Sequence, residues 1–358
     1  MKHIGMDLHS TTTDVCVRNG RGKIVFRRQI ATTRAELEKF ICGIQGPKRV
    51  AIEESQMADW VARVLKPHVD EVIRCQPQFN KLISRSEDKC DTTDSESLSE
   101  LLYLNRLKRV HHPELVYRTL REAVRAYWIA SRELTRAKNR VKAFFLFNGV
   151  RETGGTIYCV RNRSGNLAKL ENPGGNTGLA RLLYERMDHC RQLKAKHILI
   201  LRESARPVKD SVRLLMTMPA IGPISAYTLV AYLEDGRRLP NKRKLWRYAG
   251  LSLRRHQSGS VGTEGASHSG NRMMKHVAMS AAITIVARGE SNALSTLWEK
   301  DIRQQVDPKR ARRNLARKIV VIAQHLLRSK QEYSDERVMV SCGRISGMDA
   351  EGHFQGMS

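Results

Sequence analysis

Apolar and polar residues alternate at the start of the chain, in a pattern typical of a β-strand. Ile4 and Met6 fall on one face of an extended segment, and Asp7 falls on the other. Two more strands are predicted at residues 12–18 and 23–29, across short turns that contain glycine. The sequence therefore begins with three antiparallel strands, of which the first carries a carboxylate.

The next part of the chain alternates between helix and strand patterns, which predicts a mixed α/β fold. An apolar run at residues 49–53 has the composition of a buried strand and ends in Glu53 and Glu54. A second carboxylate is thus expected at the carboxyl end of a strand. Three antiparallel strands with an acid on the first, as predicted above, are how a nuclease core of the RNase H/RuvC type begins. The other elements expected here are helices at 33–44 and 58–65 and a strand at 71–74.

Residues 86–98 form the most acidic segment of the chain. Asp91 and Asp94 are three residues apart at the start of a helix predicted to run to about residue 107, so both can face the same side of its first turn. Helix capping and the helix dipole are one explanation for carboxylates there. The other is a divalent metal ion such as Mg²⁺, which prefers oxygen ligands. Four acids, two from strands and two from this helix, favour the metal.

The rest of the chain is predicted to be helical. Long helices at 114–147 and 178–202, joined by a polar, glycine-rich connection, predict an antiparallel coiled-coil arm. Residues 218–226 resemble the hairpin of a helix-hairpin-helix, in which the backbone at Gly222 would meet a phosphate. An ordinary Gly-Pro connection between helices explains the same residues.

A segment rich in Ser, Gly, Arg and His follows at residues 250–270 and is predicted to be a loop. Within it, Ser258 precedes Gly259 and lies close to Arg254 and Arg255. A small accessible hydroxyl near cations suits attack on a phosphate, because the cations stabilise the transition state. An ordinary surface loop remains the alternative.

Two further helices and a tail complete the chain. One helix is predicted at 271–288, and the last begins after Asp307 and carries a basic side for phosphate contacts. Residues after about 331 lack periodicity and are predicted to form a loose tail. The basic side of the last helix comprises Arg310, Arg313, Arg317 and Lys318.

The charge of the chain indicates which class of partner it binds. The sequence contains 63 Lys and Arg against 36 Asp and Glu, a formal charge of +27, which indicates a polyanionic partner, foremost nucleic acid. No run of about 18 apolar residues and no secretory signal pattern are present, so we expect a cytoplasmic protein without membrane association. The seven dispersed cysteines include no CxxC pair, and neither a disulfide framework nor a zinc site is predicted.

With these motifs in their order, the chain resembles the IS110 family of transposases (IS1111 type), which is related to the Piv DNA invertases. The resemblance spans about residues 3–330. It departs from the family pattern at residues 53–56, at Cys90, and at Ala220, where the family has glycine. The matching pieces are residues 4–7, 51–55, 89–94, 218–223, 248–251 and 257–259.

The resemblance implies an α/β plus all-α architecture. An RNase H/RuvC-like catalytic domain with a DEDD acidic set would occupy residues 1–112, a coiled-coil region 113–205, a helical transposase domain 206–330 and a tail 331–358. The serine of this pattern is Ser258, with Ser260 as the neighbouring alternative. The acids are Asp7, Glu53, Asp91 and Asp94, with Glu54 as the alternative to Glu53; they would bind Mg²⁺ or Mn²⁺.

The implied function is that of a DNA recombinase which excises and inserts its own mobile element. A structured guide RNA encoded beside the element would pair with the target and with the element ends. Ser258 would form a phosphoserine with DNA, and the protein would act as a dimer that pairs into a tetramer, in a bacterial cytoplasm and associated with the nucleoid. Site-specific inversion is a variant of this reading. The alternatives are a metal-only RuvC-like endonuclease and a nucleic-acid-binding protein without catalysis.

Overall fold

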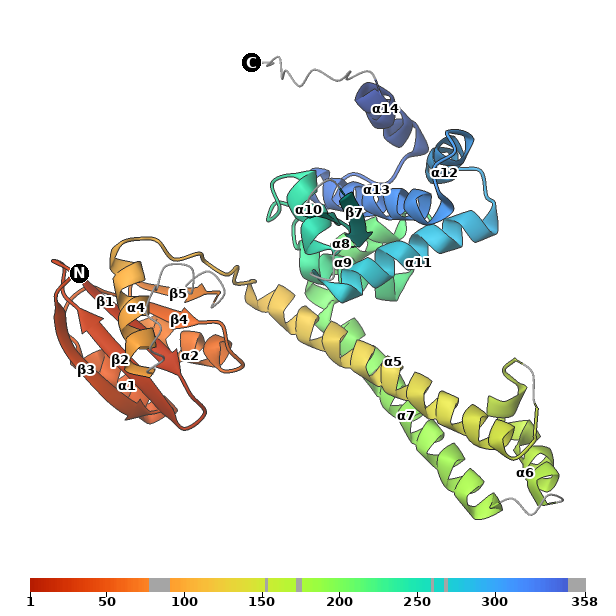
Figure 1. The fold of residues 1–358 in the computed structure, drawn as a ribbon, viewed down its shortest axis with the longest axis horizontal. Coiled ribbons are helices and arrows are strands. Elements are labelled where there is room, and N and C mark those ends of the chain that lie inside the picture. The colour runs from red at the N-terminus through yellow and green to blue at the C-terminus, as the bar shows by residue number, and fades with distance from the viewer. Residues whose placement is uncertain (77–90, 152–153, 172–175, 259–260, 267–269, 347–358) are drawn as a thin grey trace. The chain divides into compact units, whose positions relative to one another are not determined.

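The computed structural model describes residues 1–76, 91–151, 154–171, 176–258, 261–266 and 270–346. The chain divides into two compact units, Met1–His112 and Pro113–Ser358. Each unit is described by itself below, with the elements labelled as in Figure 1.

The N-terminal unit is built on a five-stranded sheet, which confirms the predicted α/β class. Strand order is β3-β2-β1-β4-β5; β1 pairs antiparallel with β2, and β2 with β3, whereas β1, β4 and β5 are parallel. The strands are β1 Lys2–Leu8, β2 Thr12–Arg18, β3 Ile24–Ala31, β4 Lys48–Glu53 and β5 Glu71–Cys75.

Two helices, α1 (Arg34–Gly43) and α2 (Ala58–Leu65), cover one face of this sheet. Thr33 caps α1, because its side chain accepts a hydrogen bond from the backbone of Glu36. The apolar positions of the strands, including Ile4 and Ile52, are fully buried against these helices. A short 3-10 turn, Lys66–His68, follows α2.

Helix α4 (Asp91–Tyr103) covers the opposite face and packs mainly on β1 and β2. It ends four residues earlier than the sequence predicted, and the chain then turns at Asn105, which has a positive φ of 53°. Leu98 and Leu102 of α4 are buried against Ala51 and other apolar residues of β4 and β5.

In the C-terminal unit two long helices, α5 (Leu115–Phe147) and α7 (Thr177–Ser204), lie side by side (Figure 1). Their connection was predicted to be an irregular polar segment, and this is wrong for part of it. Two 3-10 turns, Thr156–Tyr158 and Val160–Asn162, are followed by α6, Arg163–Glu171. Apolar residues of this segment are buried against α5 and α7, among them Ile157, Leu167 and Leu170. This packing stabilises helical structure in a segment whose sequence has no extended helical periodicity.

The base of α5 is joined to a helical bundle. Arg121 of α5 forms an ion pair of 2.5 Å with the buried Glu234 and donates to the carbonyl of Ala231 at 2.7 Å. Seven of the eleven residues of helix α9 are buried, and the helix packs within the core of the bundle. The bundle helices are α8 Lys209–Met216, α9 Pro223–Leu233, α10 Lys242–Tyr248, α11 Arg272–Arg288, α12 Ala293–Arg303 and α13 Pro308–Ser329, with a 3-10 turn at Arg206–Val208 before α8.

The predicted loose tail is also corrected by the structure, since residues Asp335–Ser346 form α14. Asp335 accepts a hydrogen bond of 2.8 Å from the backbone N–H of Ala293 and one of 2.7 Å from the Tyr333 hydroxyl. A contact with another helix therefore fixes the start of α14, and such a contact leaves no periodic signal in the sequence. Among the helices of the described residues, none is long and apolar enough to cross a membrane.

Candidate active site

The sheet face under α4 holds the two predicted strand carboxylates. Strands β1 and β4 are parallel, and the last pair in their register is Met6 with Ile52, so Asp7 and Glu53 come next on neighbouring strands. Because side chains alternate along a strand, Asp7 lies on the side opposite to the buried Met6, which is the side of α4. Its side chain is 16% exposed. The carboxyl ends of the two parallel strands thus bring these acids to one edge of the unit.

Gly5 determines how closely α4 approaches β1. A Cβ atom at this position would lie 2.5 Å from the backbone nitrogen of Ser99 and still closer to the carbonyl oxygen of Ser95, so only glycine fits. Nearer the start of β1, the ring of His3 packs edge to face on Tyr103 at 5.4 Å. Helix α4 therefore runs antiparallel to β1, and its first turn lies toward the Asp7 end of the strand.

That first turn carries the other two predicted acids. The buried side of α4 comprises Ser95, Leu98, Ser99 and Leu102, and the helical period continues this side to Asp91 and Asp94. Asp94 is exposed. Asp91 is the first residue of α4, and its side chain lies outside the described part of the structure.

The structure adds a carboxylate that the sequence analysis did not single out. Asp14 pairs directly with Asp7 in the antiparallel register of β1 and β2, and it is only 8% exposed. His9 lies between them, with its Nε2 at 3.1 Å from Asp7 Oδ2 and 3.9 Å from Asp14 Oδ2. Gln29 donates to both oxygens of Asp14 at 3.2 and 3.3 Å. Asp14 lies between Thr13 and Val15, so the alternation of side chains that places Asp7 on the polar face of its strand also places Asp14 there. This alternation could have identified Asp14 from the sequence.

Glu53 and Glu54 differ in their surroundings. Glu54 is within 3.4 Å of the buried Arg74 guanidinium, which also binds Asp59 of α2 at 2.9 Å. Glu54 therefore forms an ion pair on the side of α2. Alternation along the chain directs Glu53 to the opposite side, toward α4.

These residues are chemically suited to a divalent metal ion. Carboxylate oxygens are the ligands that Mg²⁺ prefers, and a cation would offset the repulsion between acids gathered on one face. Among the side chains that the structure describes, no three His, Cys, Asp or Glu groups converge closely enough to hold a metal by themselves. The set that the sequence predicts includes Asp91, whose side chain is outside that description.

Ser258 belongs to the C-terminal unit, and its surroundings differ from the prediction. The predicted loop at 250–270 contains a two-stranded hairpin, β6 (Leu253–Ser258) and β7 (Val261–Ala266). Ser258 is the last residue of β6 and pairs with Val261. Ser260 lies outside the described residues, as do the side chains of Arg254, Arg255 and Ser258. Because β6 and β7 contain few apolar residues, their sequences show no alternation of apolar and polar residues that would predict strands. The strands are recognised only from their backbone pairing in the structure.

The base of this hairpin is fixed to the bundle. A Cβ on Gly270 would lie 2.6 Å from the backbone of Gly250, so the two ends of the segment are in direct contact. The backbone N–H of Asn271 donates to the carbonyl of Tyr248 at 2.7 Å. Arg317, predicted to contact nucleic acid, donates to the carbonyl of Leu251 at 2.8 Å and lies over the Trp246 ring. Its guanidinium therefore supports the hairpin base.

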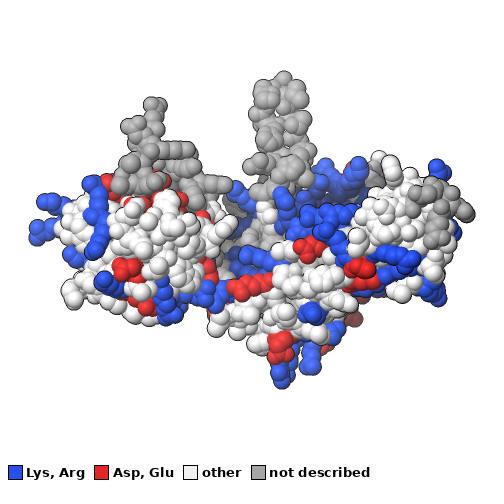
Figure 2. All heavy atoms as spheres, turned by 90° about the horizontal axis from the view of Figure 1, so that it is seen from below, with Lys and Arg blue, Asp and Glu red and all other residues white. Residues whose placement is uncertain are grey.

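The other predicted phosphate contacts are on the bundle surface. Arg310 is exposed in the first turn of α13, Arg313 is half-buried, and Gly222 is exposed at the start of α9. On the face drawn in Figure 2, Lys and Arg form broad groups with smaller acidic groups between them. This distribution agrees with a formal charge of +27.

Comparison with known proteins shows the family. Residues 4–147 match the family model of the DEDD transposases of IS110, described as a transposase, and residues 212–299 match the model described as the transposase IS116/IS110/IS902 family. The chain belongs to the IS110 family of transposases. The first match covers the sheet from Ile4 onward together with α4 and α5, and the second runs from α8 to α12 and includes the hairpin.

Two curated relatives agree with membership of the IS110 family. A probable family 20 transposase of Pseudomonas aeruginosa is 27% identical over 271 residues, covering 72% of this chain and 76% of the relative. The transposase for insertion sequence element IS1328 of Yersinia enterocolitica is 25% identical over 291 residues, covering 80% of this chain and 84% of the relative. The predicted family is confirmed, and with it the assignment as a transposase.

Proposed function

We propose that this transposase excises and inserts its own insertion sequence by serine attack on DNA phosphodiesters, assisted by Mg²⁺ at the acidic face. The observation that carries the proposal is the position of Asp7 and Glu53 at the ends of adjacent parallel strands, beside the first turn of α4. That arrangement supports phosphoryl transfer, because Mg²⁺ bound to carboxylates stabilises the charge that develops on a reacting phosphate.

The serine step conserves the energy of the broken bond. The Ser258 Oγ would form a bond to phosphorus as the bond from phosphorus to one strand oxygen breaks, and that oxygen leaves with a proton. A strand hydroxyl would later attack the phosphoserine and release the serine with its proton restored. Asp7, Glu53, Asp91 and Asp94 would hold the metal ion, and the cationic surface would hold the DNA backbone.

A denaturing gel tests the serine. The full-length protein is incubated with labelled element-junction DNA, its flanking RNA and Mg²⁺, and Ser258→Ala is compared with Ser260→Ala as the matched control. We expect a protein-linked DNA band from the wild type and Ser260→Ala, and none from Ser258→Ala. Loss in Ser260→Ala alone would move the nucleophile to Ser260, and cleavage by all three proteins without a linked band would establish a metal-only nuclease.

We further propose that an RNA encoded beside the element guides target choice, a proposal that rests on the resemblance and on the charge of the chain. Replacing the segment of this RNA that pairs with the target should redirect insertion to the new complementary site. Unchanged insertion sites would exclude guidance. By the same resemblance we propose a dimer that pairs into a tetramer on DNA, which light scattering with and without nucleic acid would measure.

A further inference from the structure

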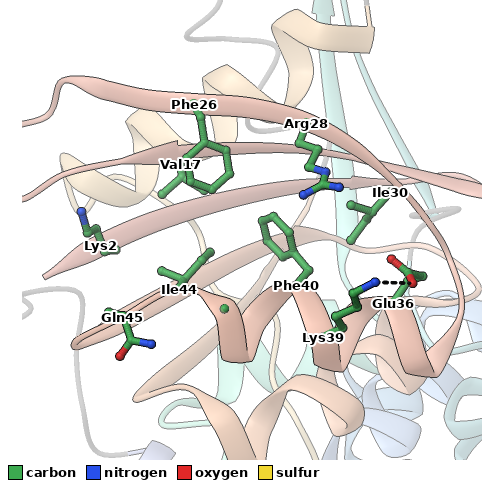
Figure 3. Close-up of a pocket in the computed structure, with 11 residues that line it drawn as sticks. Lys2, Val17, Phe26, Arg28, Ile30, Glu36, Lys39, Phe40, Ile44 and Gln45 are labelled. Carbon is green, nitrogen blue, oxygen red and sulfur yellow. Dashed lines mark ion pairs between the residues drawn. The ribbon is translucent and has the colours of Figure 1, made fainter.

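A groove on the N-terminal unit lies on the sheet face opposite to the acids. It has a volume of about 610 Å³ and is bounded by the edge strand β3 and its neighbour β2 on one side and by α1 on the other (Figure 3). This volume falls within the range of ordinary ligand sites. The active-site proposal uses none of its residues.

Two aromatic rings form the apolar part of this groove. Phe26 of β3 and Phe40 of α1 point toward one another with centroids 6.1 Å apart and ring planes at 75° (Figure 3). Phe26 is 38% exposed although it is a large apolar residue on a strand. Rings left accessible beside a cavity offer their surfaces to a flat ligand.

Three cations surround the rings. Lys2, Arg28 and Lys39 line the groove, against a single carboxylate, Glu36. Glu36 pairs with Lys39 at 3.6 Å, and both side chains are exposed, so this pair contributes little. Within the described part of the chain, the side chains of Lys2 and Arg28 form no ion pair or hydrogen bond. Three cations against one carboxylate therefore leave the groove with a net positive charge, and Lys2 and Arg28 carry the part that Glu36 does not offset.

Gly43 keeps one wall of the groove open. It lies in the last turn of α1, and a Cβ added there would meet no atom within 4 Å. Glycine in a helix costs about 1 kcal/mol relative to alanine. The fold does not require glycine at this position, and the open space is on the groove side.

We propose that this groove binds an unpaired nucleotide of single-stranded DNA. The base would stack on the exposed ring of Phe26 with Phe40 against its edge, since the two ring planes are 75° apart, and Arg28 with Lys39 would bind the flanking phosphates, the combination by which proteins hold single strands. An uncharged apolar ligand would leave the cations unused. The inference rests on the proposed function, since strand exchange produces unpaired DNA. In this proposal the groove binds a DNA strand that is not the one cut at the acidic face.

Photo-crosslinking of the full-length protein tests the groove. A single-stranded DNA containing 5-bromodeoxyuridine is irradiated with the wild type, Gly43→Leu and Arg28→Glu, and crosslinked peptides are mapped by mass spectrometry. Gly165→Leu is the matched control, because Gly165 is also a helical glycine with nothing within 4 Å of an added Cβ. We expect crosslinks at Phe26 or Phe40 that fall about fivefold or more in both groove variants and persist in Gly165→Leu.

Crosslinks that map only elsewhere, or that persist at full yield in Gly43→Leu and Arg28→Glu, would overturn the proposal. Crosslinking of a bromouridine RNA at these rings without crosslinking of DNA would overturn the assignment to DNA. Thermal unfolding of each variant confirms that the comparison is made on folded protein. Ser258→Ala separates the two proposals, because it should abolish the covalent adduct and leave the groove crosslink unchanged.

Discussion

The two faces of the N-terminal sheet are built from alternate residues of the same strands and differ in every property that matters for function. Under α1 and α2, the strands present large apolar residues such as Ile4 and Ile52, all buried. Under α4, the same strands present Gly5, Ala51 and the acids. Because successive side chains of a strand point to opposite faces, a residue that stabilises the fold and a residue proposed for chemistry can be neighbours in the sequence.

The difference between the two faces also explains why several carboxylates can lie on the α4 face. The apolar face alone buries enough side chains to hold the sheet and two helices together. On the other face, small residues let the backbone of α4 lie close to β1, which brings a helix start and its partial positive charge toward acids on the strands. Removing the charge of an acid on the α4 face should therefore lower activity without lowering stability, and truncating a buried apolar residue on the other face should lower stability without lowering activity.

The largest effect is expected for Asp7→Asn. The substitution keeps the shape of the side chain and removes its charge, so transfer of DNA strands should fall by about 10²-fold or more while the melting temperature stays level or rises. Strand-transfer assays and thermal unfolding on the same preparation measure both. Glu54→Gln is the control, because Glu54 pairs with Arg74 on the side of α2, and it should keep its activity. Full activity in Asp7→Asn would remove the α4 face from the mechanism.

Gly5→Ala should come next. One added methyl group would overlap the backbone of Ser95 and Ser99, so α4 must move away from β1. Overpacking of this kind costs about 1 to 3 kcal/mol of unfolding free energy or more. We expect both a lower denaturation midpoint and a loss of strand transfer, since the acids of α4 move with the helix. A variant with reduced stability and undiminished transfer would show that the position of α4 is not critical.

The sequence predicted the N-terminal unit well because its elements carry local signals. The strands at β1, β2 and β4 alternate or form apolar runs with turn residues between them, and α1 has a capping threonine, so their positions were predicted to within two residues. The same holds for α13, which starts at Pro308 directly after its cap Asp307, as expected. Where one face of an element is buried against a core, the period of the pattern is sufficient.

Several of the elements that were missed depend on contacts between distant residues. The β6–β7 hairpin is stabilised by pairing of polar strands, α14 by the contact of Asp335 with α12, and α6 by burial against α5 and α7. In the candidate site, Asp14 was missed because a single acid on a strand becomes informative only once the register sets it beside Asp7. The distance between the acids of the strands and those of α4 depends on how closely α4 approaches β1 at Gly5. The sequence alone does not distinguish Gly5 from other glycines.

The smallest effect is expected for Ile52→Val, which removes one methyl group from the apolar face opposite Gly5. Ile52 is fully buried, and this change typically costs about 0.5 to 1.5 kcal/mol of unfolding free energy. Because Glu53, the next residue, points to the other face, strand transfer below the melting temperature should match that of the wild type. Chemical denaturation and the strand-transfer assay measure the pair of values. A loss of activity as large as that of Gly5→Ala would mean that the apolar face positions the acids as tightly as α4 does, and the division of labour between the two faces would then be wrong.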